Sequence, residues 1–335
     1  MKARTWGLIT WVAASWAGGV WAQAPTPPAG QPAQVIPAPS GAPVIPVSAS
    51  SGKPAAVVNG EPIPYSEVEN VLRAMGPMSP TPLTEAQKRE KQLEAVNMLI
   101  DDLLMQQFLR QNSPPVDPAE VEKHIAELRA RLKAQNKTLE EMLKESNLTE
   151  AQLRANVQNM LRWAAYVKAR VTDADVRKYY DDNREFFDKV TVRASHIVLR
   201  VPATASEAER AAARQKLQAL RADILAGKVD FAAAAKAHSQ CPSAANGGDI
   251  GYFTRKFMLD ENFARAAFAM KVNELSDIVQ TEYGLHLIRV TDRKPGEPSD
   301  FEKIKEEVRS FYIDEMQMAI MAQLRKTARI EVNLP

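Results

Sequence analysis

The sequence predicts an α+β protein in which a mostly helical domain, formed by both ends of the chain, carries an inserted α+β domain. Three observations support this prediction. Apolar residues recur at helical spacing on both sides of a middle segment. Strands and helices alternate within that segment, residues 189–295, which indicates a compact α+β module. Short β-rich stretches occur near both ends, at 57–58 and 330–332.

The charge balance argues against a nucleic-acid partner. The 335 residues include 43 Lys and Arg and 41 Asp and Glu, so the formal net charge is only +2. A chain of this kind has no excess of basic residues to form a face for a phosphate backbone. Its 45% hydrophobic and 25% charged content is ordinary for a protein that buries a core.

The N-terminus has the pattern of an export signal. Lys2 and Arg4 precede an apolar run that ends at Val20, and a Val-Trp-Ala sequence ends at Ala22. The run is short for a membrane span and contains Ser and Gly. We therefore expect residues 1–22 to be a cleaved signal peptide, with a periplasmic or secreted location and no stable membrane anchor. An uncleaved anchor is the alternative.

Residues 23–54 have the composition of a linker. From Gln23 to Gly52 there is no charged residue, and prolines stand among Ala, Ser, Gln and Gly. Such a segment cannot bury enough apolar area to offset the loss of chain entropy. We expect a Pro/Ala-rich, disordered tether.

The helical part begins with a short strand at Val57-Val58, followed by an Asn59-Gly60 turn. Apolar residues three and four positions apart then predict amphipathic helices. Their ranges are 85–111, 118–134, 138–146, 149–170, 173–186 and, beyond the middle segment, 301–328. We expect the strand-like stretch Ile330–Val332 to pair with Val57-Val58. This pairing would join residues 55–188 and 298–335 into one domain.

The middle segment, residues 189–295, has the length of a self-contained domain. VTVRASHIVLRV is β-rich, and HLIRVTD closes the segment with a second strand. Between them the sequence predicts helices at 207–225, 231–238 and 262–270 and a short strand at 250–253.

Two histidines, His196 and His286, lie in the middle of the two longest strand patterns. Alternation along a strand places Val192, Ala194 and Val198 on the face of His196, and Ile288 and Val290 on the face of His286. If the two strands are neighbours, the imidazoles can meet within an apolar surface. The alternative is that each is a core histidine with a backbone partner.

Cys241 is the only cysteine, so an internal disulfide is excluded. A nucleophilic thiol would need a base, and His238 lies three residues earlier, but no hydrolase signature surrounds it. Zinc would need about four ligands, and the four histidines lack the spacing. A buried, inert thiol stays open. The following Gly247-Gly248 indicates a tight turn rather than a phosphate cradle.

Several motifs in the middle segment make Arg193–Asp292 resemble the parvulin family of peptidyl-prolyl cis/trans isomerases. They are ASHIVLR, SQCPSAANGGDIGYF and TEYGLHLIRV, with Met258 and Phe263 spaced between them. The flanking stretches VVNGEPIPYSEV and VTDADVRKYYDDNREFF resemble the helical part of secreted SurA-like and PrsA-like foldases. The resemblance implies a parvulin-like domain at 189–295, with a small antiparallel sheet flanked by helices. This domain would be inserted into a SurA-like, chaperone-like helical domain.

The resemblance also implies roles for nine residues. His196 and His286 would pair at the floor of the site, Thr281 would hold one imidazole, and Cys241 would lie beside the prolyl amide. The substrate-binding residues would be Ile250, Phe253, Met258, Phe263 and Tyr283. Such a site uses no cofactor and no metal ion. The stretch 200–214 lacks the arginine-serine loop of the phosphate-directed members, so we expect no phosphate requirement.

The chemistry implied by this resemblance needs no covalent step. An X-Pro bond rotates over a barrier of about 18–20 kcal/mol because rotation breaks amide resonance. A site that binds the twisted amide better than the planar one accelerates the rotation. The expected clients are unfolded secreted or outer-membrane polypeptides that contain X-Pro bonds. The alternative function is a non-enzymatic holdase with an inactive module.

The helical part leaves two questions open. Its methionines would either give an adaptable lining to a client-binding groove or fill the core. A homodimer formed through the helical domain is the other open point.

Overall fold

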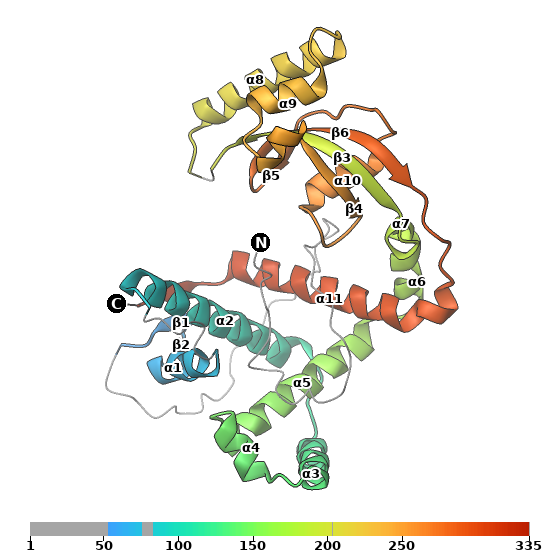
Figure 1. Cartoon of the computed structure of the whole chain (residues 1–335). Helices are drawn as coiled ribbons and strands as arrows, with labels where there is room; N and C mark the ends of the chain where they lie inside the picture. Colours follow the sequence, from blue (N-terminus) through green and yellow to red (C-terminus); the bar gives the residue numbers. More distant parts are fainter. Residues whose placement is uncertain (1–52, 76–82, 203, 335) are drawn as a thin grey trace. The chain divides into compact units, whose positions relative to one another are not determined.

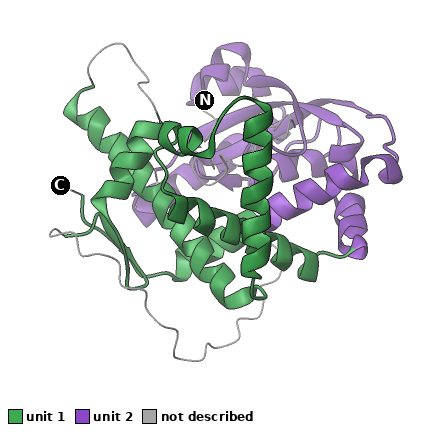
Figure 2. Ribbon diagram, turned by 90° about the horizontal axis from the view of Figure 1, so that it is seen from below, with its two compact units in different colours: residues 1–22, 30–172, 317–335 green, residues 23–29, 173–316 purple. Residues whose placement is uncertain are grey.

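A computed structural model describes residues 53–75, 83–202 and 204–334 (Figure 1). The expected signal peptide and most of the expected linker lie outside these residues. The described chain divides into two compact units (Figure 2). The first contains the residues up to Thr172 and those from Gln317 onward, and the second is Asp173–Met316. Within the described ranges, none of the helices combines the length and apolar character that crossing a bilayer requires.

A three-stranded antiparallel sheet joins the two ends of the described chain in the first unit. Its strands are β1 (Ala56–Val58), β2 (Glu61–Ile63) and β7 (Ile330–Val332), in the order β2-β1-β7. Val58 lies opposite Ile330, and Asn59 and Arg329 exchange hydrogen bonds just beyond the strands. The predicted pairing of the two ends is therefore confirmed.

Most helices of the first unit begin after a residue whose side chain caps them, and the first of them, which follows Pro64, is the exception. The helices are α1 (Tyr65–Ala74), α2 (Glu85–Asn112), α3 (Pro118–Ala134), α4 (Leu139–Glu145) and α5 (Glu150–Arg170). Thr84, Thr138 and Thr149 form capping boxes, in which the cap side chain and the residue three positions later satisfy each other's backbone N–H groups. The apolar faces of α3, α4 and α5 share one core cluster.

The second unit is built around a four-stranded antiparallel sheet. Its strands are β3 (Thr191–Arg200), β4 (Asp249–Thr254), β5 (Val279–Thr281) and β6 (Gly284–Lys294), in the order β4-β3-β6-β5. Helices α8 (Glu207–Leu225) and α9 (Phe231–His238) cover one face, and α10 (Glu261–Ala269) covers the other (Figure 1). The fold class predicted from the sequence is confirmed.

Alternation along β3 and β6 sends their side chains into two separate cores. Val192, Ala194, Ile288 and Val290 pack with the α10 side, whereas Ile197, Leu199, Leu285 and Leu287 pack with α8 and α9. A register shift after Arg193 interrupts the β3–β6 ladder. Such a bulge increases the local twist and redirects the strand that follows.

Three further helices belong wholly or partly to the second unit. They are α6 (Asp173–Asp182), α7 (Arg184–Phe187) and α11 (Phe301–Thr327), the last of which continues into the residues of the first unit. The sequence predicted one helix over 173–186, but the structure divides it at Asn183. The Asn183 side chain donates to the carbonyl of Tyr179, and its backbone leaves the helical region with φ −119° and ψ 27°.

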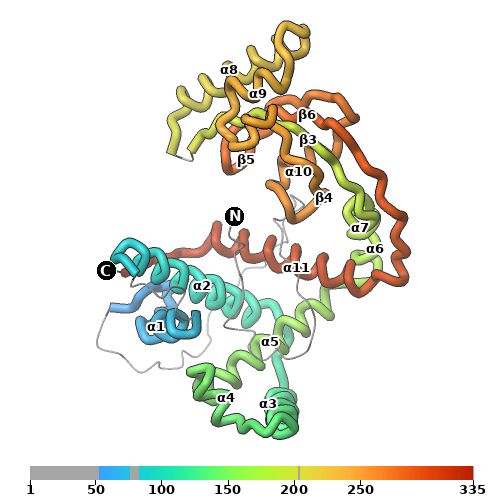
Figure 3. Tube along the Cα trace, viewed as in Figure 1, coloured from blue at the N-terminus to red at the C-terminus, as the bar shows by residue number. Residues whose placement is uncertain are grey.

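The chain enters and leaves the sheet domain through two adjacent connections, which can be followed in Figure 3. Asp188 Oδ1 accepts hydrogen bonds from the backbone N–H and the hydroxyl of Ser299, at 2.7 and 2.6 Å. At Gly296 a Cβ would lie 1.6 Å from the carbonyl oxygen of Asp188, so only glycine fits this crossing.

Candidate active site

His196 and His286 meet inside the second unit, on the face of the sheet that packs against α10. His196 lies opposite Ile288, and His286 lies opposite Val198. The two histidines are therefore diagonal neighbours on one face, and their Nδ1 atoms are 3.2 Å apart. Their exposed fractions are 8% and 4%. The predicted meeting of the two imidazoles is what the structure shows.

Burial keeps both imidazoles neutral. It lowers the pKa of His196 from 6.5 to about 4. Burial, with a smaller contribution from the charge of His196, lowers the pKa of His286 to about 4 as well. A neutral imidazole has one donor nitrogen and one acceptor nitrogen, so the two facing Nδ1 atoms can share a single proton in one hydrogen bond.

Thr281 fixes the direction of this hydrogen bond. The backbone N–H of Tyr283 donates to Thr281 Oγ1 at 3.1 Å, and the same oxygen lies 2.8 Å from His286 Nε2. We assign the proton of Thr281 Oγ1 to the hydrogen bond with His286 Nε2. His286 then carries its proton on Nδ1 and donates it to His196. His196 consequently carries a proton on Nε2, a buried atom without a partner among the described residues.

Phe263, on α10, covers both imidazoles. Its ring lies edge-on to His196 and His286, with centroid distances of 5.6 and 5.5 Å. The aromatic ring supplies apolar contact without a polar atom, which keeps water from the two histidines. Phe253 lies 6.0 Å behind Phe263 and is 2% exposed, so it supports Phe263 from within the core.

Cys241 lies at the start of η1 (Pro242–Asn246), the turn that joins α9 to β4. Its thiol is half-buried, and its backbone N–H donates to Ser239 Oγ at 3.4 Å. Ser239 Oγ also accepts from the N–H of Val198, two residues from His196. This serine thus ties the Cys241 segment to β3. Within the described chain, no hydrogen bond links the thiol to a base, so the geometry offers no activated nucleophile.

Gly248 brings the chain directly against His196. The N–H of His196 donates to the carbonyl of Gly248 at 2.9 Å. A Cβ at Gly248 would lie 2.3 Å from the His196 carbonyl oxygen, and φ at this residue is +84°. The turn after Cys241 therefore requires glycine for two reasons, the close approach and the left-handed backbone. The sequence indicated the turn but not its contact with the histidine strand.

The remaining predicted residues differ in exposure. Met258 and Tyr283 are each 54% exposed, and Ile250 is partly buried against the α10 core. Met258 follows β4, and its Sδ lies 3.4 Å from the Thr254 amide. The two exposed side chains offer apolar and aromatic contact area to a ligand. Within the described ranges, no hydrogen bond joins the Tyr283 side chain to the histidine pair.

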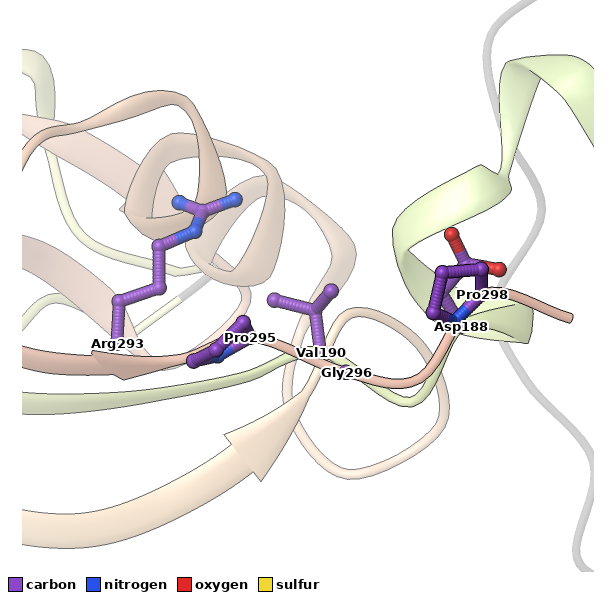
Figure 4. Close-up of a pocket in the computed structure, with 6 residues that line it drawn as sticks. All are labelled: Asp188, Val190, Arg293, Pro295, Gly296 and Pro298. Atoms are coloured by element: carbon purple, nitrogen blue, oxygen red, sulfur yellow. The ribbon is translucent and has the colours of Figure 1, made fainter.

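No metal centre is formed by the described residues, since no three His, Cys, Asp or Glu side chains gather at ligating positions. A cavity of about 410 Å³ lies elsewhere, where the sheet domain joins its connections (Figure 4). It is lined by Asp188, Val190, Arg293, Pro295, Gly296 and Pro298. None of the predicted site residues borders it.

Comparison with known families agrees with this architecture. Residues 196–292 match the family described as PPIC-type PPIASE domain, and residues 44–167 match the SurA-like N-terminal domain. The fold and both matches define a chain that carries a PPIC-type isomerase domain together with a SurA-like N-terminal domain. The resemblance inferred from the sequence is thereby confirmed.

Among individual proteins, the chain is similar to the foldase protein PrsA of several bacteria. It is 38% identical to PrsA of Geobacillus kaustophilus over 152 residues, which cover 45% of this chain and 47% of the relative. It is 26% identical to a PrsA of Clostridium botulinum over 306 residues, covering 83% and 87%. The chain thus spans about half the length of the Geobacillus relatives that it matches.

The crystal structure of the peptidylprolyl isomerase PrsA from Bacillus anthracis is also similar. It shares 22% sequence identity with this chain at a TM-score of 0.41, and the alignment covers 69% of this chain and 94% of that one.

Proposed function

We propose that this protein is an exported peptidyl-prolyl cis/trans isomerase and folding chaperone that acts on unfolded polypeptides containing X-Pro bonds. One observation carries the proposal. Two buried, neutral histidines form a hydrogen-bonded chain with Thr281, and this chain leaves one buried donor, His196 Nε2, without a hydrogen-bond partner among the described residues. A structural histidine pair would satisfy that donor, whereas a binding site leaves it for a ligand.

The proposed mechanism is binding of the twisted amide. In the transition state the prolyl nitrogen becomes pyramidal and the carbonyl loses its conjugation. Protein groups that interact better with this twisted amide than with the planar one lower the barrier to rotation. Phe263 and the exposed Met258 would hold the proline ring. The neutral His196–His286 pair provides fixed dipoles in a dry environment, where electrostatic interactions are strong. Cys241 would be a polar neighbour of the amide.

The segment after β3 lacks the arginine-serine loop that phosphate-directed members of the resembled family use, and its Arg210 is not available for a phosphate on the substrate. In the segment after β3, Arg210 is already engaged, because its guanidinium donates to the carbonyls of Ala205 and Pro202 and pairs with Glu207. We therefore propose unphosphorylated X-Pro segments as the substrate class.

The chaperone part of the proposal rests on the SurA-like match and on the similarity to proteins named foldases. We assign the isomerase to residues 189–295 and the chaperone-like domain to residues 55–188 with 298–335. Export rests on the N-terminal signal pattern of residues 1–22. Unfolded exported proteins are accordingly the proposed clients.

The test is catalysed exchange of an unphosphorylated Ala-Pro peptide by the full-length protein, measured by exchange NMR. We expect exchange well above the uncatalysed rate, and loss of most of it in His286→Ala. His238→Ala is the matched control, because His238 is exposed and lies outside the histidine pair. Near-UV circular dichroism verifies that each variant is folded. A folded wild-type protein without catalysis would contradict the isomerase and leave the holdase.

A further inference from the structure

The loop between β4 and α10, residues 255–260, contains a charged side chain that is almost completely buried. Lys256 is 5% exposed, and its Nζ lies 2.5 Å from Oε1 of Glu315 on α11, which is 4% exposed. The same ammonium lies 3.5 Å from the hydroxyl of Tyr179 on α6 and 5.1 Å from the centre of its ring. All of these residues belong to the second unit. Lys256 therefore fastens the loop to two helices outside the sheet domain.

The next residue, Phe257, fastens the loop a second time. Its ring stacks on Phe311 of α11 at 5.3 Å and an interplanar angle of 22°, and meets Phe186 of α7 edge-on at 4.9 Å. Its φ is +76°, a left-handed conformation that is rare for an aromatic residue. Such a backbone persists only where the surroundings hold it in place, and it points to a functional constraint.

The loop leads from this anchor directly to the candidate site. Met258 follows Phe257 and is exposed, with its sulfur against the Thr254 amide. The loop ends at Asp260, whose carboxylate accepts from the N–H groups of Asn262 and Phe263 at the start of α10. Phe263 in turn covers both histidines. A shift of the loop would therefore move both apolar groups proposed to hold the proline ring.

We propose that the Lys256–Glu315 ion pair is a positioning device that sets Met258 for the proline ring, so that affinity for X-Pro peptides depends on α11. The inference rests on the proposed function. Methionine has three rotatable bonds and adapts to its surroundings. The position of an exposed methionine side chain therefore depends mainly on the position of its backbone. Removing one partner of a buried ion pair leaves an uncompensated charge, which draws the segment toward water.

The first test compares kinetic constants of full-length variants with an unphosphorylated Ala-Pro peptide. In Glu315→Gln and in Lys256→Met we expect KM to rise about tenfold, because a displaced Met258 loses contact with the proline ring. We expect kcat to stay within about twofold, because Met258 would contact the ring equally in the planar and twisted states. The double variant K256M/E315L replaces the pair by apolar side chains and should return KM to within about threefold of wild type.

Glu185→Gln is the matched control. Glu185 of α7 pairs with Arg293 of β6, so this variant also breaks an ion pair between the sheet domain and a flanking helix, but a half-exposed one that involves no residue of the 255–260 loop. We expect its KM to be unchanged. Equal KM values in Glu315→Gln and Glu185→Gln would overturn the proposal, as would additive effects of the two single changes in the double variant.

A second readout does not depend on catalysis. In protein labelled with ¹³C-methyl methionine, Glu315→Gln should shift or broaden the Met258 signal and leave that of Met270 unchanged. Met270 is the internal control because it lies in the core of the same domain, 8% exposed. If wild type shows no catalysis, the proposed function fails, yet a moved Met258 signal still supports the positioning. An unmoved Met258 signal in a folded variant contradicts the positioning whatever the activity.

Discussion

His196 and His286 are diagonal neighbours on β3 and β6, and their Nδ1 atoms lie 3.2 Å apart although 90 residues separate them in sequence. The diagonal placement brings the Nδ1 edge of one imidazole to the Nδ1 edge of the other. Each ring is covered by Phe263, so the pair is both hydrogen-bonded and dry. The candidate site is therefore centred on this hydrogen-bonded, water-excluded histidine pair.

The two lowered pKa values predict that stability falls in mild acid. A histidine whose pKa is about 4 when folded and 6.5 when unfolded takes up its proton more readily in the unfolded chain. Each neutral ring contributes roughly 3 kcal/mol to the free energy of unfolding. This contribution is complete above about pH 6.5 and is lost as the pH falls toward about 4. Urea unfolding of the second unit between pH 7.5 and 4.5 measures this. A pH-independent midpoint in this range would show that the rings are not held neutral.

Thr281→Val should weaken both the site and the fold. The change removes the hydroxyl that accepts from the Tyr283 amide and donates to His286, and leaves a partly buried ring nitrogen unpaired. We expect a loss of about 1–3 kcal/mol in the free energy of unfolding. We also expect kcat/KM for an Ala-Pro peptide to fall about tenfold. Thr281→Ser, which keeps the hydroxyl, is the control and should retain activity. Equal activities of the Val and Ser variants would show that the Thr281 hydroxyl does not contribute to activity.

Cys241→Ala distinguishes a polar neighbour from a nucleophile. Because no base among the described residues is hydrogen-bonded to the thiol, we expect kcat/KM to fall by less than about tenfold, whereas loss of a covalent nucleophile costs several orders of magnitude. Cys241→Ser should remain close to wild type. Exchange kinetics of both variants measure this. Complete inactivity of a folded Cys241→Ser protein would argue for covalent chemistry.

Gly248→Ala should be far more damaging than the same change at Gly251. A Cβ at Gly248 would collide with the carbonyl oxygen of His196, while one at Gly251 meets nothing within 4 Å. Both residues have positive φ, so the strain of a left-handed backbone, about 1–2 kcal/mol, is common to both variants. The difference between their unfolding free energies isolates the collision, which we expect to exceed about 2 kcal/mol. Similar unfolding free energies would mean that the turn moves away from β3 without cost.

Period-two alternation predicted the apolar face of its own strand for each histidine, and a meeting of the two imidazoles if the strands were neighbours. Val192 and Ala194 pack on the same side of the sheet as Ile288 and Val290, as the alternation required. The bulge after Arg193 was not predictable, since an extra residue in one strand is defined by its partner strand and leaves no periodic signal. Strand β5, which supplies Thr281, was also missed because its three residues are too few to show alternation.

The anchor of the 255–260 loop could not be predicted either. A lysine between a strand and a helix is usually solvated, and Glu315 belongs to a helix whose charges alternate with apolar residues. The burial of both side chains depends on tertiary contacts that join residues 59 positions apart. In contrast, the pairing of Val57-Val58 with Ile330–Val332 was predicted because both stretches were β-rich and flanked the helices.

That pairing has a consequence for the order in which the protein folds. Asn59 and Arg329 are hydrogen-bonded across 270 residues, so β1 cannot gain its second neighbour until synthesis has passed Val332. The four-stranded sheet draws all its strands from residues 191–294 and can close earlier. The isomerase domain would then be complete while the three-stranded sheet still waits for its last strand. A chain stopped before Ile330 should keep its histidine pair and exchange the β1 amide protons rapidly.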